Sequence, residues 1–89
     1  MSNENNKDHD HDKPVTIIVN GRPKEFAEKY ISFEQVIILA FDKYEDNENI
    51  VYTVTYSRGE DGRQGTMVKG DKVKVKKDMI FNVTRTDKS

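Results

Sequence analysis

The chain has 89 residues, with 15 basic and 16 acidic side chains and a formal net charge of −1. That balance provides no overall field that would attract nucleic acid or an anionic membrane. Cysteine is absent, which excludes thiol nucleophiles, disulfides and thiolate metal sites. The length suits one small domain. No apolar run is long enough to cross a bilayer, and the acidic first residues do not resemble a signal peptide, so we expect a cytoplasmic location.

The first 13 residues contain no aliphatic or aromatic side chain after Met1. We expect this segment to be disordered and dispensable for folding, because it cannot bury enough surface to offset its ordering entropy. His9 and His11 alternate there with three aspartates, which are metal-ligand types. A segment without preorganised geometry is a poor chelator, so we predict a solvated acidic tail and no metal site.

A β-hairpin is predicted to open the fold after Pro14. Residues 15–19 are β-branched throughout, the composition of a strand. Asn20 and Gly21 are the strongest short hairpin signal, and we assign the turn to residues 20–23. Residues 24–30 are expected to return as a more polar edge strand anchored by Phe26.

Residues 31–41 form the only segment with a clear helical period. Ser32 and Gln35 have the spacing of a capping box, which marks a helix start. Apolar side chains then recur at helical spacing and predict one face packed on a sheet: Phe33, Val36, Ile37, Ala40 and Phe41.

The second half of the chain alternates as strands do. Residues 50–57 should direct Tyr52, Val54 and Tyr56 to one face, and Val51, Thr53 and Thr55 to the other. Further extended segments are expected at residues 66–68, 72–76 and 79–84. The predicted core contains the apolar residues of the inward faces: Ile17, Val19, Phe33, Val36, Ile37, Ala40, Val54, Val75, Met79, Phe81 and Val83.

This order of elements predicts an α+β fold, a β-grasp, over residues 14–85. A mixed sheet of four to five strands would wrap one helix, with the last strand central and parallel to the first. A right-handed crossover is what connection rules favour. The alternative is another α+β roll with one helix on one face of a sheet.

A search for catalytic chemistry is negative. The chain holds no HExxH, Walker loop or GxGxxG, and its two histidines lie in the acidic tail, so we expect no enzyme activity and no cofactor. Residues 59–62 could hold a cation or phosphate, although loop chemistry alone explains them. A row of lysines could meet an acidic partner or a phosphate backbone, or could be a solvated strand face: Lys69, Lys72, Lys74, Lys76 and Lys77.

Two stretches of sequence carry a resemblance to a known family. TIIVNGRPKEF followed by YISFEQVIILAF, and later VYTVTYSRG and VKGDKVKVKKDMIFNVTRTDKS, resemble the bacterial multiubiquitin-domain family. The resemblance covers residues 14–89 and implies a ubiquitin-like β-grasp fold. It also implies a protein modifier attached through its C-terminal carboxylate, whose partners are ubiquitin-activating-like and conjugating-like enzymes, an isopeptidase-like protease and a protein target.

If the chain is a modifier, its conjugation tail comprises Arg85, Thr86, Asp87, Lys88 and Ser89. These residues lack large apolar side chains, so we expect a tail without strong structure. Ubiquitin relatives end in Gly-Gly, which is absent from this sequence. Either the partner enzyme has a wider channel, or a protease trims the tail first, or this chain is not conjugated.

The alternative hypothesis is a non-covalent interaction module that binds partners through its sheet surface or an edge strand. Its contact surface would be the outer face of the sheet, for which we select Ile18, Thr53, Thr55 and Ile80.

Overall fold

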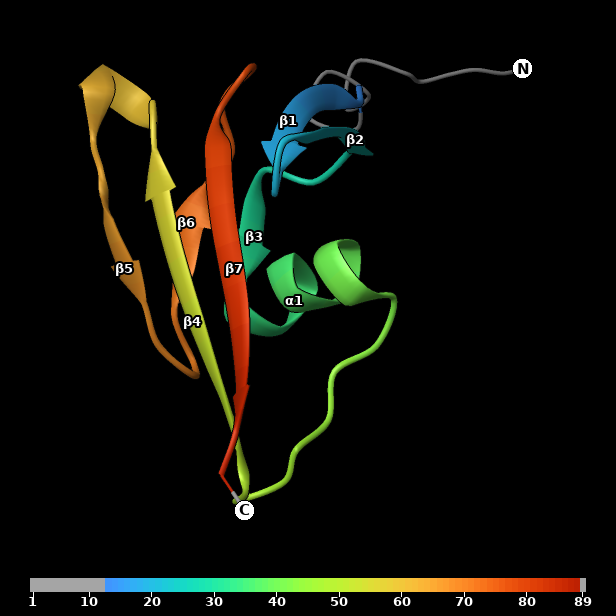
Figure 1. Ribbon diagram of the computed structural model, residues 1–89. Coiled ribbons are helices and arrows are strands. Elements are labelled where there is room, and N and C mark those ends of the chain that lie inside the picture. The colour runs from blue at the N-terminus through green and yellow to red at the C-terminus, as the bar shows by residue number, and fades with distance from the viewer. Residues whose placement is uncertain (1–12, 89) are drawn as a thin grey trace.

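The computed structural model describes residues 13–88. A mixed five-stranded sheet has the order β2-β1-β7-β4-β5, and a separate two-stranded sheet joins β3 and β6. One helix packs on one face of the larger sheet, as the β-grasp prediction required (Figure 1). The elements are β1 (Val15–Val19), β2 (Arg22–Phe26), β3 (Tyr30–Ser32), α1 (Phe33–Phe41), β4 (Ile50–Ser57), the 3₁₀ turn η2 (Glu60–Gly62), β5 (Gly65–Met67), β6 (Lys72–Lys74) and β7 (Ile80–Asp87).

The β1–β2 hairpin turns on Asn20 and Gly21, whose φ angles are 53° and 80°. Positive φ at both central residues is the signature of a type I′ turn, which matches the twist of the strands. The predicted four-residue turn was too long, because Arg22 and Pro23 already belong to β2. That strand is at the edge of the sheet, as predicted, and Pro23 is tolerated there.

The predicted second strand over residues 24–30 was wrong in its second half. The strand ends at Phe26, and the chain forms a separate strand, β3, immediately before the helix. This strand pairs with β6, so that Tyr30 faces Lys74 and Ser32 faces Lys72. The segment predicted at residues 72–76 therefore belongs to the smaller sheet, and its regular part is shorter than expected.

Helix α1 begins with the predicted capping box. The Oγ of Ser32 accepts a hydrogen bond from the Gln35 backbone N–H at 3.2 Å, and the Gln35 Oε1 accepts from the Ser32 N–H at 2.9 Å. The helix ends at Phe41 and is capped by Asp42, whose φ of 68° is left-handed and whose N–H donates to the Ile38 carbonyl at 2.7 Å. Two N-terminal donors and one C-terminal acceptor are thereby satisfied locally.

Strands β1 and β7 run parallel, which confirms the predicted central position of the last strand. The Ile18 N–H donates to the Met79 carbonyl at 2.8 Å, and the Asn20 N–H donates to the Phe81 carbonyl at 2.9 Å. The Asn20 side chain then continues the ladder: its Oδ1 accepts from the Val83 N–H at 2.7 Å and its Nδ2 donates to the Val83 carbonyl at 3.1 Å. A turn residue thus extends the β1–β7 contact beyond the end of β1.

The core lies between α1 and the sheet. Every residue of the predicted core is buried except Ala40, which is half-buried and packs against the others. Ile31 and Met67 are also buried, although the sequence did not place them in the core. Ile31 is buried because it lies in β3 opposite Val73 of β6, not in the helix. Met67 is buried because it pairs with Val54 of β4.

Candidate functional site at the end of the last strand and on the outer sheet face

The C-terminal residues do not form the unstructured tail that we expected. Arg85, Thr86 and Asp87 belong to β7 and pair with Tyr52, Val51 and Ile50 of β4. The Lys88 N–H donates to the Asn49 carbonyl at 2.6 Å, which extends the contact by one residue. The predicted domain boundary at residue 85 therefore falls inside a strand. Ser89 lies outside the described residues, as do residues 1–12.

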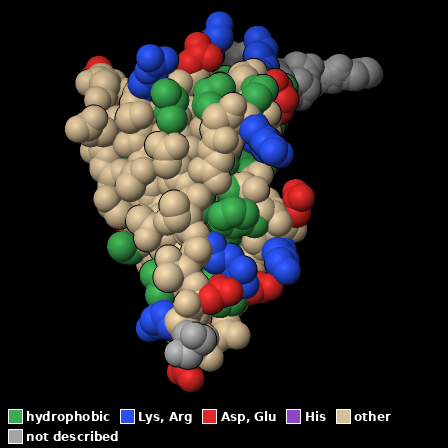
Figure 2. Space-filling model, in the orientation of Figure 1, with side chains coloured by type: hydrophobic (Ala, Val, Ile, Leu, Met, Phe, Trp, Pro, Cys, Tyr) green, Lys and Arg blue, Asp and Glu red, His purple; other side chains and the backbone are tan. Residues whose placement is uncertain are grey.

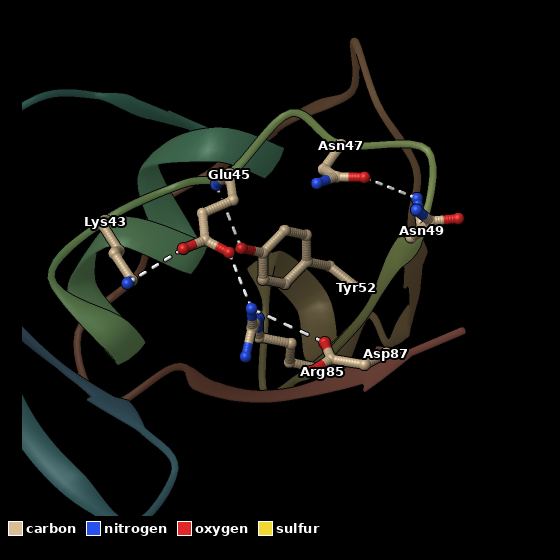
Figure 3. Close-up of polar contacts among 7 residues, drawn as sticks. All are labelled: Lys43, Glu45, Asn47, Asn49, Tyr52, Arg85 and Asp87. Carbon is tan, nitrogen blue, oxygen red and sulfur yellow. Dashed lines mark hydrogen bonds and ion pairs between the residues drawn. The ribbon is translucent and has the colours of Figure 1, made fainter. Parts of the chain in front are cut away.

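A polar cluster fixes the end of β7 to the loop that follows α1 (Figure 3). The Arg85 guanidinium Nη2 lies 2.7 Å from the Glu45 Oε1 and 3.5 Å from the Asp87 Oδ1. The other oxygen of Glu45 binds the Lys43 ammonium at 2.9 Å. Glu45 thus bridges the loop and the strand, and it does so between two cations.

Tyr52 connects this cluster to the core. Its hydroxyl accepts a hydrogen bond from the Glu45 backbone N–H at 3.1 Å (Figure 3). Its ring packs against those of Tyr44 and Phe41, with centroid separations of 5.4 and 6.2 Å. The loop that follows α1 is therefore fixed both by aromatic contacts of Tyr44 and by hydrogen bonds of Glu45.

The ion pairs change the titration of this cluster. Hydrogen bonds from Lys43 and then Arg85 lower the pKa of Glu45 below its ordinary value of 4.5, and the hydrogen bond to Glu45 raises the pKa of Arg85. A carboxyl group whose pKa is lowered by folding stabilises the folded state at pH values above its ordinary pKa. This contribution is lost as the pH falls through the lowered pKa. Acidification therefore weakens the attachment of the strand end.

Only one side of this strand end is paired. The Val83 N–H points to Asn20 on the β1 side, and successive N–H groups of a strand alternate in direction. The N–H groups of Arg85 and Asp87 therefore also point to the β1 side, where β1 has already ended at Val19. Among the strands that the structure describes, β4 alone pairs with β7 beyond Val83.

The second predicted site is the outer sheet face. Ile18 and Ile80 are direct neighbours across the β1–β7 pair, which follows from the predicted parallel arrangement of the first and last strands. Both are half-buried, so the apolar spot that they form is less exposed than expected. Thr53 and Thr55 lie on the same face but on β4, opposite Thr84 and Asn82 of β7.

The two threonines are not beside the isoleucines. Ile80 pairs with Ser57, from which Thr55 is two residues and Thr53 four residues away along β4, roughly 7 and 14 Å. The structure therefore places the four selected residues on one face but not in one compact patch.

The outer face of β4 and β7 carries no charged side chain, although 35% of the chain is charged. This face also includes residues that we had not selected. For Thr84 and Thr86, the sequence could have indicated it, because the alternation of the last strand continues past Val83. Figure 2 shows a broad area over these strands with few charged groups. The face comprises Val51, Thr53, Thr55, Ser57, Ile80, Asn82, Thr84 and Thr86.

Metal-ligating side chains do not gather in the part of the chain that the structure describes. Within residues 13–88 no group of three or more His, Cys, Asp or Glu side chains could hold a metal ion. The alternating aspartates and histidines of residues 8–12 lie outside these residues. No helix among residues 13–88 is long and apolar enough to span a membrane.

One helix on a five-stranded mixed sheet with a parallel β1–β7 pair defines a ubiquitin-like β-grasp protein. A family model for multiubiquitin matches residues 15–87. Since this match covers most of the chain, the protein belongs to the multiubiquitin family. No curated protein and no solved structure matches it.

Proposed function

We propose that the chain is a ubiquitin-like protein modifier, activated at its C-terminal carboxylate and conjugated to a protein target. Its partners would be an adenylating enzyme of the ubiquitin-activating class, a conjugating enzyme and an isopeptidase-like protease. Membership of the multiubiquitin family supports the fold on which such modifiers are built.

The observation that carries this proposal is the position of the end of β7. The strand runs past the helix and past β1, and it ends at one pole of the molecule (Figure 1). Residues 84–87 are all exposed, so a partner's active site can approach them from several directions.

The chemistry at the terminus needs no catalytic group from this chain. An oxygen of the Ser89 carboxylate would attack the α-phosphorus of ATP, forming an acyl-adenylate and releasing pyrophosphate. A nucleophile of the partner enzyme or of the target would then attack the acyl carbon and release AMP. Side chains of the partner enzymes would supply proton transfer.

The conjugation tail would have to leave β4 before it enters an enzyme. Release requires loss of the Ile50–Tyr52 pairing to Arg85–Asp87 and of the Glu45–Arg85 ion pair. A protease that trims the chain before activation would meet the same requirement. The polar character of these contacts makes release less costly than opening a packed core would be.

Intact mass spectrometry tests the proposal. The chain is incubated with ATP and with adenylating and conjugating enzymes from the same genome that are active on another substrate. We expect a covalent adduct, whose mass shows whether Ser89 is used directly or the chain is trimmed before activation. A chain with an amidated C-terminus is the matched control for direct use. The absence of any adduct would contradict the modifier function.

The uncharged outer face favours a second candidate function, a non-covalent interaction module. A neutral face of hydroxyl and aliphatic groups suits contact with another protein, because little charge must be desolvated. The double variant Ile18→Ser/Ile80→Ser should then bind the same enzymes more weakly while its thermal melt remains cooperative. Binding that depends on these residues, without any adduct, would replace the modifier function by this one.

A further inference from the structure

We propose that a groove across β3 and β6 binds an acidic peptide segment of a partner protein, one that carries an aromatic or large apolar side chain beside its carboxylates. This groove lies between the smaller sheet and the loop that follows β4, apart from the end of β7 and from the outer face of β4 and β7. The inference goes beyond the proposed function and does not depend on it.

The groove consists of two adjoining hollows that share Tyr30 and Lys72. The first has a volume of about 400 Å³ and the second about 480 Å³. The first is lined also by Tyr56, Gly59, Glu60, Arg63, Val73, Lys74 and Met79, and the second by Glu28, Lys29, Ser32 and Gln35.

The groove has an excess of positive charge. Four cationic side chains line it, against two carboxylates: Lys29, Arg63, Lys72 and Lys74 against Glu28 and Glu60. Among residues 13–88, no ion pair engages Lys29, Arg63 or Lys72. These three cations are available to carboxylates from another molecule.

Glu60 is a carboxylate of the chain that lies in the groove and is paired with a cation there. Its Oε2 lies 3.2 Å from the Lys74 ammonium. The Lys74 hydrogen bond, with smaller contributions from Lys76 and Arg63, lowers the pKa of Glu60. One carboxylate of the chain thus lies among three cations, so the local field favours further negative charge.

Apolar walls complement the cations in the first hollow. Tyr30 is 49% exposed at the junction of the two hollows, and the Lys29 ammonium lies 5.9 Å from its ring centroid. Val73, Tyr56 and the buried Met79 form the remaining apolar wall. A ligand with carboxylates alone would leave this wall unused, which is why we infer an aromatic or large apolar side chain among the acids.

The walls of this hollow are closely packed. A Cβ at Gly65 would lie 3.1 Å from the Tyr56 hydroxyl, and one at Gly59 would lie 3.2 Å from the Arg63 carbonyl and 3.3 Å from the Met79 Cε. The backbone at Gly59 and Gly65 therefore lies so close to Met79 and Tyr56 that a Cβ would crowd these side chains. A site whose walls are fixed before binding loses less entropy when a ligand enters.

Fluorescence anisotropy with a synthetic peptide tests the inference. The labelled probe is a ten-residue peptide of Asp and Glu around one central Phe. The double variant Arg63→Ser/Lys72→Ser should weaken its binding on the order of tenfold or more, because two charge-assisted contacts are lost. The matched control Arg22→Ser/Lys77→Ser removes the same charge at residues that do not line the groove. It should change binding less than about twofold, since exposed charges that do not contact the peptide are screened.

Two further probes separate the required features of the ligand. A peptide with Asn and Gln in place of the acids, and one with Gly in place of Phe, should each bind more weakly than the parent. On the protein, the amide resonances of Tyr30, Gly59 and Lys72 should shift on titration with the parent peptide, while those of Thr53 and Thr84 should not.

Several results would overturn the inference. Equal loss of binding in the groove variant and in the control variant would mean a general charge effect. Equal binding of the parent and Gly-containing peptides, or of heparin, would mean a polyanion site and not a peptide groove. A cooperative melt of each variant, recorded first, ensures that lost binding is not lost folding.

Discussion

The two halves of β7 differ in the interactions that fix them to the rest of the domain. Residues 80–83 lie between β1 and β4, and Phe81 and Val83 are buried against the helix. Residues 84–87 continue the same strand, but they pair with β4 alone and every one is exposed. Apolar burial fixes the first half, whereas backbone pairing and the Glu45–Arg85 contact fix the second.

This difference separates global from local stability. Contacts of the core are lost only when the whole domain unfolds, whereas exposed strand ends with polar contacts open locally. The second half of β7 can therefore detach without unfolding the first. Such a division would suit the modifier function that we propose, in which the terminus enters another protein's active site.

The substitution Phe81→Ala should have the largest effect. Truncating a buried Phe typically costs about 3–5 kcal/mol, and a small domain has only about 5–15 kcal/mol to lose. Phe81 is 0% exposed, so we expect a largely unfolded protein in a thermal melt. The neighbour Asn82, on the outer face, is the matched control, and Asn82→Ala should stay within about 0.5 kcal/mol of the parent. Similar melts for both variants would contradict the alternation of the strand.

Asn20→Gly should have an intermediate effect. Glycine keeps the positive φ of the turn but removes both hydrogen bonds to the Val83 backbone, which should cost about 1–3 kcal/mol in chemical denaturation. Asn20→Asp retains the acceptor for the Val83 N–H and should lose less. An unchanged midpoint in the glycine variant would show that the side chain adds nothing to the ladder.

Acidification should have the smallest effect, on the second half of β7, where it removes the contacts of Glu45. Protonation of Glu45, whose pKa lies below 4.5, removes its contacts to Lys43 and Arg85. Amide resonances of Thr84 and Thr86 should then shift as the pH falls through that pKa, while those of Phe81 and Asn82 remain in place. Glu45→Gln should abolish the transition; its persistence in that variant would assign it to another carboxyl.

The sequence predicts those parts of the fold that have a period. Alternation in β4 and the first half of β7 identifies the core face, and the spacing of Ser32 and Gln35 identifies the helix start. It does not predict β3, because a strand of three residues is too short to display a period. It predicts β6 as an extended segment, but not the pairing of β6 with β3. Their formation depends on pairing between segments that are some forty residues apart.

The same limit applies to the candidate site. The adjacency of Ile18 and Ile80 follows from the parallel arrangement of the first and last strands, so the topology predicts it. The polar composition of Arg85–Asp87 does not predict that these residues form part of a strand. Their place in the strand depends on strand β4 and on Glu45, which is 40 residues from Arg85 in the chain. Composition alone therefore suggests a tail where the tertiary contacts make a strand.

Native-state hydrogen exchange across β7 tests the central claim most directly. The N–H groups of Asn82 and Thr86 both face β4, since they alternate with that of Val83. We expect Asn82 to exchange only through global unfolding, with a rate that rises steeply with denaturant. Thr86 should exchange faster, with little dependence on denaturant, and faster still in Arg85→Ala. Equal protection and equal denaturant dependence at the two amides would contradict the account, because the strand would then open as one unit.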